Sequence, residues 1–180
     1  MLKVKGLLKA KGLLFCFVFS TCVLLFGSFP VKTEAATTWK FSSGFSSTQG
    51  QNQWYYRYWN GASYQNMTWD ATATLWKGNE TFLLIGDSSM HPGTNGDAAL
   101  GWKAPSNMSI SIKGNLLRYY KTQGDGDLVR IVRDRGGVYT QLWPSSGNQV
   151  LYPGSYASFV LTTAVNQNDM IYFLVNQNGN

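Results

Sequence analysis

The sequence predicts an all-β protein, an antiparallel β-sandwich or jelly roll built from about ten short strands. Three observations lead to this fold class. Apolar and polar residues alternate with a period of two, turn-forming residues recur at short intervals, and no stretch is long and periodic enough for a helix of three turns. Strands that lack helical crossovers pair antiparallel, and two such sheets bury their apolar faces against each other.

The N-terminal 35 residues have the pattern of a secretory signal peptide. Four lysines precede an almost wholly apolar stretch from Gly12 to Phe29, and Thr33-Glu34-Ala35 supplies the small residues of a cleavage site after Ala35. An uncleaved membrane anchor is the alternative, because the apolar stretch approaches spanning length. We therefore expect residues 36–180 to form a single secreted, extracellular module. Because the chain ends in the turn sequence Asn178-Gly179-Asn180, we also expect the module to continue beyond it.

Removing the signal peptide changes what the composition implies. The whole chain has 15 basic and 9 acidic residues, a net charge of +6, but residues 36–180 keep ten basic and eight acidic residues, a net charge of +2. A nucleic-acid partner is not indicated by so small a charge. Both cysteines, Cys16 and Cys22, also lie in the signal, so the module has neither a disulfide nor a thiolate metal site.

The expected strands follow one another between turn sequences. The first is aromatic and ends before Asn60-Gly61, the next two flank Lys77-Gly78-Asn79, and the fourth follows Asn95-Gly96-Asp97. In chain order these strands are 54–58, 72–76, 81–85 and 98–102.

The second half of the module alternates more clearly. Ser109-Ile110-Ser111-Ile112 has a period of two, and the strands around it end at Gly124-Asp125-Gly126, Gly136-Gly137 and Pro153-Gly154. The last strand is a short apolar run closed by an Asn/Gly turn. In chain order these strands are 109–112, 116–120, 128–133, 138–143, 158–162 and 170–175.

One short segment holds eight large aromatic side chains among Asn, Gln, Ser and Thr, which is more than one small core can bury. They are Trp54, Tyr55, Tyr56, Tyr58, Trp59, Tyr64, Trp69 and Trp76. Side chains alternate along a strand, so Trp54, Tyr56 and Tyr58 share one face and Tyr55, Arg57 and Trp59 share the other. We expect the second set to face solvent and to bind ligand, because exposed rings beside amide groups suit the apolar faces and hydroxyl rims of sugars.

Three further residues are weaker candidates for ligand contact. Tyr64 and Trp69 belong to the same aromatic segment, although burial of Trp69 is at least as well supported as exposure. His91 precedes Pro92-Gly93, where the simpler interpretation is a side chain that hydrogen-bonds its own turn.

A series of motifs resembles the non-catalytic β-sandwich modules, similar to carbohydrate-binding modules, of secreted bacterial polysaccharide-degrading and surface proteins. The motifs are Phe45 to Tyr56, His91-Pro92-Gly93, Trp102-Lys103-Ala104-Pro105, Gly124-Asp125-Gly126 and Gln141-Leu142-Trp143-Pro144. The resemblance spans nearly all of residues 41–180. It implies a β-sandwich that binds polysaccharide, part of a larger carbohydrate-active protein. The sequence departs from the usual pattern at Asp127-Leu128 and at Asp134 to Gly137.

The catalytic inventory of the module is small. His91 is its one histidine, which excludes a site with two or three His ligands, and the eight acids lie mainly beside Gly or Asn in expected turns. No nucleophile elbow, phosphate loop or HExxH motif occurs. We therefore expect a binding protein rather than an enzyme, with no required cofactor. Asp125 and Asp127 could hold a structural Ca²⁺, against the simpler interpretation of a plain β-turn.

Two other functions remain open at this point. A small polysaccharide lyase needs only Tyr or His for proton transfer and Arg, Asn or Gln to neutralise a sugar carboxylate, and His91, Arg118, Tyr119, Tyr120 and Arg130 offer these groups. A surface adhesion module that recognises protein is the second. The partner we expect is a polysaccharide or oligosaccharide, bound by a monomeric module with no nucleic acid and no membrane contact after signal removal.

Overall fold

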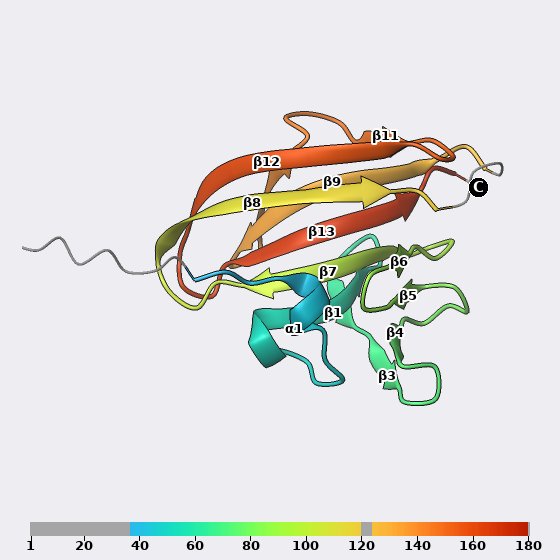
Figure 1. Ribbon diagram of the computed structural model, residues 1–180, viewed down its shortest axis with the longest axis horizontal. Helices are drawn as coiled ribbons and strands as arrows, with labels where there is room; N and C mark the ends of the chain where they lie inside the picture. The colour runs from blue at the N-terminus through green and yellow to red at the C-terminus, as the bar shows by residue number, and fades with distance from the viewer. Residues whose placement is uncertain (1–36, 120–123, 180) are drawn as a thin grey trace, which may run out of the picture. The chain divides into compact units, whose positions relative to one another are not determined.

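The structure, a computed structural model, describes residues 37–119 and 124–179, so the predicted signal peptide lies outside the described residues (Figure 1). Thirteen strands and two short helices, α1 (Phe41–Gly44) and a 3-10 helix (Gln51–Gln53), make up this part of the chain, and every strand pair is antiparallel. The predicted all-β sandwich class is therefore confirmed. No helix in residues 37–119 and 124–179 has the length and apolar character needed to cross a membrane.

The largest sheet has seven strands and carries both apolar cores. Its order is β10-β9-β13-β7-β1-β2, and β11 pairs with the free half of β9 beside β10. The strands are β1 (Trp54–Trp59), β2 (Tyr64–Asn66), β7 (Asp97–Lys103), β9 (Asp127–Arg135), β10 (Val138–Trp143), β11 (Gln149–Leu151) and β13 (Met170–Gln177).

Two smaller sheets cover one face of this large sheet. One pairs β8 (Met108–Leu117) with β12 (Tyr156–Val165), and the other has the order β3 (Thr68–Asp70), β4 (Leu75–Lys77), β5 (Leu84–Ile85), β6 (Met90–His91). Figure 1 shows the β8–β12 pair in front of β9 and β13, and the four short strands beside β7 and β1. The main core lies between the layers, where Tyr56 stacks on Trp76 with ring centroids 4.6 Å apart and Phe159 meets Phe173.

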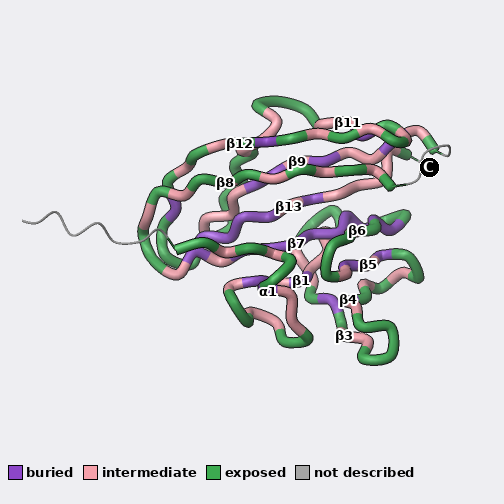
Figure 2. Tube along the Cα trace, viewed as in Figure 1, coloured by how far each residue is buried: buried purple, intermediate pink, exposed green. Residues whose placement is uncertain are grey.

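The alternation predicted for β1 is correct. Trp54 and Tyr56 are buried in the main core, whereas Tyr55, Arg57 and Trp59 alternate with them and lie on the opposite face of the large sheet, where all three are half-buried. The same alternation runs through β8 and β12, where exposed residues recur at every second position, and Figure 2 shows exposed and less exposed residues in turn along the two strands. One face of the large sheet thus packs into the main core, and the other carries a second cluster that is rich in aromatic residues.

Several expected boundaries differ from the structure. Residues 109–112 and 116–120 are not two strands: β8 runs unbroken through Gly114, and Tyr120 lies outside the described residues. Gly114 sits opposite Phe159, and a Cβ on it would lie 2.6 Å from the Phe159 ring, so this glycine makes room for a ring instead of ending a strand. Residues 71–74 form a turn before β4, where a strand was expected from residue 72.

An ion pair between the buried Asp169 carboxylate and the partly exposed Arg135 side chain closes the turn between β12 and β13. Asp169 accepts hydrogen bonds from Arg135 Nε and Nη2, the shortest at 2.7 Å, and from the backbone N–H of Asn166 at 2.9 Å. Burial alone raises the pKa of the Asp169 carboxyl, but these donors outweigh it and hold the pKa below its usual value. The carboxylate therefore joins the end of β9 to the turn that starts β13.

Substituting Gly114 with Val tests the glycine–ring fit. The new side chain overlaps the buried Phe159 ring, and we expect a loss of about 1–3 kcal/mol in the free energy of unfolding, measured by chemical denaturation. Ser111→Val is the matched control, because Ser111 lies on the same strand but faces solvent. A Gly114→Val protein as stable as the control would contradict the fit.

Substituting Asp169 with Asn tests the ion pair through pH. Since the pKa of Asp169 is lowered in the folded protein, its contribution is complete at neutral pH and is lost as pH falls below about 4. We expect Asp169→Asn to cost about 1.5–3 kcal/mol at pH 7 and the two stability curves to converge in acid. The Lys77 ammonium holds the pKa of Asp70 at about 2 in both proteins, so the titration of Asp70 changes the stability of both equally and does not affect their difference. Parallel curves down to pH 2 would argue against the pair.

Candidate functional site

The open face of the large sheet gathers aromatic side chains from four strands, and we call it the aromatic face. The register aligns Tyr55 with Gly101, Arg57 with Ala99, and Tyr172 with Gly101 from the other side. The large residues of this face are Tyr55, Arg57 and Trp59 on β1, Tyr64 on β2, Tyr139 on β10 and Tyr172 on β13. The central strand β7 therefore contributes small residues, and its neighbours contribute rings.

The rings close over the middle of the sheet. Tyr64 stacks on the fully buried Tyr172 with ring centroids 3.7 Å apart, although β7 and β1 separate their strands. Trp59 meets Tyr64 at 4.8 Å, and Tyr139 contacts Trp59 and Tyr64 at 5.5 and 5.9 Å. Strands lie about 4.8 Å apart, so a flat sheet would place β10 and β2 about 24 Å from each other. The sheet is therefore strongly twisted, with two opposite corners curled towards each other.

Arg57 is held in place by two neighbours on this face. Its Nη1 donates to the Tyr172 hydroxyl at 2.7 Å, and its guanidinium lies 5.3 Å from the centre of the Tyr55 ring. Tyr55 in turn packs against Gly50, where a Cβ would lie 2.9 Å from the Tyr55 hydroxyl. Gly50 has φ of 82°, a conformation that glycine adopts without strain. The predicted set Tyr55, Arg57 and Trp59 is thus one contiguous group.

A polar network borders the rings where β7 begins. Asp97 is buried and pairs with Arg130 Nη2 at 2.8 Å, and its other oxygen accepts from Asn176 at 2.6 Å. Asp134 lies at the opposite corner beside Tyr139 and accepts from the backbone N–H of Gly137. The aromatic face therefore presents rings, guanidinium groups and amides within one continuous surface.

Three tyrosine hydroxyls on this face, those of Tyr64, Tyr139 and Tyr172, have raised pKa values. Burial raises the pKa of Tyr172 to about 12, although the nearby Arg57 acts in the opposite direction. Burial also raises the pKa of Tyr64, and the neighbouring Tyr172 adds to that effect; burial and Asp134 raise the pKa of Tyr139. These phenols are therefore hydrogen-bonding groups at physiological pH and are poor proton acceptors.

Three important members of the aromatic face were not among the expected ligand residues. Tyr139 lies on a correctly predicted strand and is 47% exposed, Tyr172 anchors the stack, and Arg130 neutralises Asp97. Strand alternation places Tyr172 on a face, but only the pairing order shows that this face is the one shared with Trp59. The strand order would have placed Tyr172 on the aromatic face, although its contact with Tyr64 also depends on the twist of the sheet.

Two of the expected ligand residues lie elsewhere. Trp69 is on β3 and packs against Trp76 and Phe45 beside the main core. His91 is exposed on β6, where its Nδ1 lies 2.7 Å from the carbonyl oxygen of Pro92, the local hydrogen bond that the simpler interpretation describes. The structure therefore brings together Tyr55, Arg57, Trp59 and Tyr64, but not Trp69 or His91.

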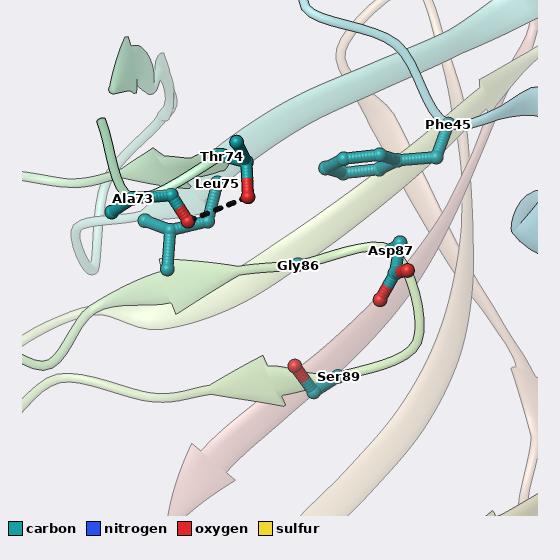
Figure 3. Close-up of a pocket in the computed structure, with 7 residues that line it drawn as sticks. All are labelled: Phe45, Ala73, Thr74, Leu75, Gly86, Asp87 and Ser89. Atoms are coloured by element: carbon teal, nitrogen blue, oxygen red, sulfur yellow. Dashed lines mark hydrogen bonds between the residues drawn. The ribbon is translucent and has the colours of Figure 1, made fainter. Parts of the chain in front are cut away.

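A separate hollow lies beside Trp69, between the loops of the four-stranded sheet. It has a volume of about 460 Å³, and Figure 3 shows the Phe45 ring on one side with the side chains of Thr74, Asp87 and Ser89 around the same space. The full lining is Phe45, Ala73, Thr74, Leu75, Gly86, Asp87 and Ser89. With a single ring and a single carboxylate, it offers a ligand fewer groups than the aromatic face does.

The expected calcium residues are partly engaged with the protein itself. Asp127 pairs through its carboxylate with Arg118 Nε at 3.0 Å, and burial raises the pKa of Asp127 despite that pairing. Asp125 lies near Asp127 and acts on it electrostatically, and the backbone carbonyl of Asp125 accepts a hydrogen bond from the Asn178 side chain. Within residues 37–119 and 124–179, no three side chains among His, Cys, Asp and Glu lie close enough together to hold a metal ion. A structural Ca²⁺ stays a prediction.

Comparison with known proteins found no matching family model, no significantly similar curated protein and no significantly similar solved structure. A function for this chain therefore has to come from the chemistry of the aromatic face.

Substituting Tyr172 with Phe tests the anchor of that face. The change keeps the stacked ring but removes the oxygen that accepts from Arg57, and we expect the free energy of unfolding to fall by about 0.5–1.5 kcal/mol. Tyr64→Phe is the matched control, because it alters the other ring of the same stack without touching the Arg57 hydrogen bond. Equal effects of the two substitutions in denaturant titrations would show that the bond contributes nothing.

Proposed function

We propose that the protein is a secreted, non-catalytic carbohydrate-binding module that holds polysaccharide on its aromatic face. The observation that carries the proposal is the grouping of Tyr55, Trp59 and Tyr139, three rings that keep solvent-accessible surface, with Arg57 between the first two along β1. Buried rings need no ligand to explain them, whereas accessible rings on one face provide a surface for stacking.

The chemistry of a sugar matches this surface in two ways. The C–H groups of a pyranose ring form an apolar patch that stacks on Trp or Tyr, and the hydroxyls around it are bound by planar polar groups such as guanidinium and amide. On the aromatic face, Trp59 and Tyr139 provide rings for stacking. The planar polar groups are those of Arg57, Arg130 and Asn176.

The expected affinity is modest. By analogy with bases stacked on aromatic side chains, each ring contributes about 1–3 kcal/mol, and the cost of association offsets part of that gain. Two or three rings then give a dissociation constant between about 1 mM and 1 μM. Such binding becomes useful when the module is tethered to an enzyme or repeated, because a second binding event then occurs at high effective concentration.

On the aromatic face, the state of three tyrosines favours binding over a lyase reaction at that face. A lyase must remove a proton from carbon, and a tyrosine does so most readily when its pKa is lowered towards neutrality. The pKa values of Tyr64, Tyr139 and Tyr172 are all raised. Among the five residues considered for a lyase, Arg118 pairs with Asp127 and Arg130 pairs with Asp97.

Removing exposed rings one at a time tests the proposal. We expect Trp59→Ala and Tyr139→Ala each to weaken retention on an immobilised polysaccharide by roughly 5- to 150-fold, the equivalent of about 1–3 kcal/mol per ring. Affinity electrophoresis against a panel of neutral and acidic polysaccharides provides the measurement.

Tyr156→Ala is the matched control, because Tyr156 is 76% exposed but lies on β12, away from the aromatic face. Thermal midpoints of all variants establish that the fold is intact. If both aromatic-face variants bind as tightly as Tyr156→Ala does, the ligand surface lies elsewhere. If the native protein is retained by no polysaccharide, recognition of a protein surface becomes the better proposal.

A further inference from the structure

Arg57 differs from most of the arginines around it in lacking a carboxylate. Of the five arginines in residues 37–119 and 124–179, Arg118, Arg130 and Arg135 pair with aspartates at 3.0, 2.8 and 2.7 Å. Arg133 donates to the carbonyl of Ala164 and to Thr140. Arg57 has only the Tyr172 hydroxyl and the Tyr55 ring as partners. Its charge is thus balanced by neither a carboxylate nor a backbone carbonyl within the described chain.

The guanidinium of Arg57 is also incompletely satisfied. Its Nε is buried without a hydrogen-bond partner, and Nη2 makes no hydrogen bond within the part of the chain that the structure describes. Nη2 is not among the buried atoms without a partner, so it is the donor that an anion can reach, and a charge-assisted hydrogen bond to it would stabilise the guanidinium. The Tyr172 hydroxyl and the Tyr55 ring meanwhile fix the side chain, so little conformational entropy remains to be lost on binding.

The surrounding charges leave Arg57 as the site for an anion. Asp97 is neutralised by Arg130. Asp134 lies on β9 beside Tyr139 and acts electrostatically on Tyr172, but no ion pair within the described residues joins it to Arg57. Lys103 lies at the end of β7 in the register that places it on the same face. With three cations and two carboxylates among Arg57, Lys103, Arg130, Asp97 and Asp134, the face has a net charge of +1.

We propose that the aromatic face selects acidic polysaccharides, with the carboxylate of a uronic acid unit bound by Arg57 while the sugar ring stacks on Trp59. This inference rests on the proposed function and specifies its ligand class. A guanidinium binds a carboxylate through short, charge-assisted hydrogen bonds, which are about twice as strong as bonds between neutral groups. Trp59 lies two residues from Arg57 on the same face of β1, so one sugar unit reaches both side chains.

Matched pairs of polymers test the inference. The probes are polygalacturonate, alginate and hyaluronate, each compared with its carboxyl-reduced form, which keeps the sugar rings but lacks the charge. We expect the native protein to bind at least one acidic polymer roughly 10- to 100-fold more tightly than the reduced form, and added NaCl to shrink that ratio. Dextran sulfate serves as an anionic polymer without carboxylates.

Two variants assign the preference to Arg57. Arg57→Gln should bring the ratio between acidic and reduced forms close to one, whereas Arg57→Lys should keep part of it because the charge remains. Lys113→Gln is the control, because it removes the same charge from an exposed position on β8, away from the aromatic face. If Arg57→Gln unfolds, the Arg57→Lys ratio still decides, because loss of the bidentate-capable guanidinium must reduce it.

The outcomes separate this inference from the proposed function. Binding of neutral polymers with no preference for acidic forms overturns the inference and leaves the proposed function intact. A preference that survives Arg57→Gln, or binding of dextran sulfate as tight as that of the uronates, overturns the assignment of a carboxylate to Arg57. Absence of binding to every polymer, neutral and acidic, overturns both.

Discussion

The aromatic face depends on the small residues of one central strand. The Tyr172 and Tyr64 rings, from strands on either side of β7, meet above this strand because Ala99 and Gly101 have side chains too small to keep the rings apart. A Cβ on Gly101 would lie 2.9 Å from the Tyr172 ring and 2.8 Å from the Met170 side chain, closer than atoms can approach without displacement. Glycine in a strand interior normally weakens it. Here the loss is offset by the stack of Tyr64 on Tyr172, which fills the space above β7.

From that stack the remaining geometry of the face follows. The Tyr172 hydroxyl is fixed by its ring, and it positions Arg57; Arg57 lies against the ring of Tyr55. Tyr64 meets Trp59 at a tilt and Tyr139 edge-on, and these contacts join the two distant corners of the twisted sheet. Because the module has no disulfides, such contacts between residues far apart in sequence help to stabilise the shape of the sheet. The Asp97–Arg130 and Asp169–Arg135 pairs fix the two ends of the central strands in the same way.

The long strands were predictable, because alternation over six or more residues is a strong signal. Residues 138–143 agree with β10 at both ends, and β1, β7, β9 and β13 extend the expected ranges by one to three residues. The strands that were missed are β2, β3, β6 and β11, each two or three residues long and too short to show a period. Residues 109–112 and 116–120 were expected as two strands, because a sequence does not reveal that Phe159 lies opposite Gly114, where β8 and β12 stay paired.

The sequence was enough to assign the residues of β1 to two faces, but not to predict the contacts that partly bury the aromatic face. Alternation assigns Tyr55, Arg57 and Trp59 to one side and says nothing about what lies across the sheet from them. Tyr64 and Tyr172 are 108 positions apart in the chain, and their contact depends on the strand order and on the twist. The half-buried state of Trp59 has the same origin, since Tyr139 reaches it from the opposite corner of the sheet.

This partial burial matters for recognition. A ring that stands free in water loses side-chain entropy when a ligand fixes it, at a cost of about 0.5–1.5 kcal/mol for a flexible side chain. Trp59 is already held between Tyr64 and Tyr139, so most of its side-chain entropy is lost when the protein folds. A ligand would then stack only on the surface of the ring that remains accessible. For the proposed sugar ligand, rigid rings beside a fixed guanidinium would favour one orientation, because both groups are already held by their neighbours. The specificity that we propose for this face would then come from the fixed spacing between Trp59 and Arg57, and it would need no deep pocket.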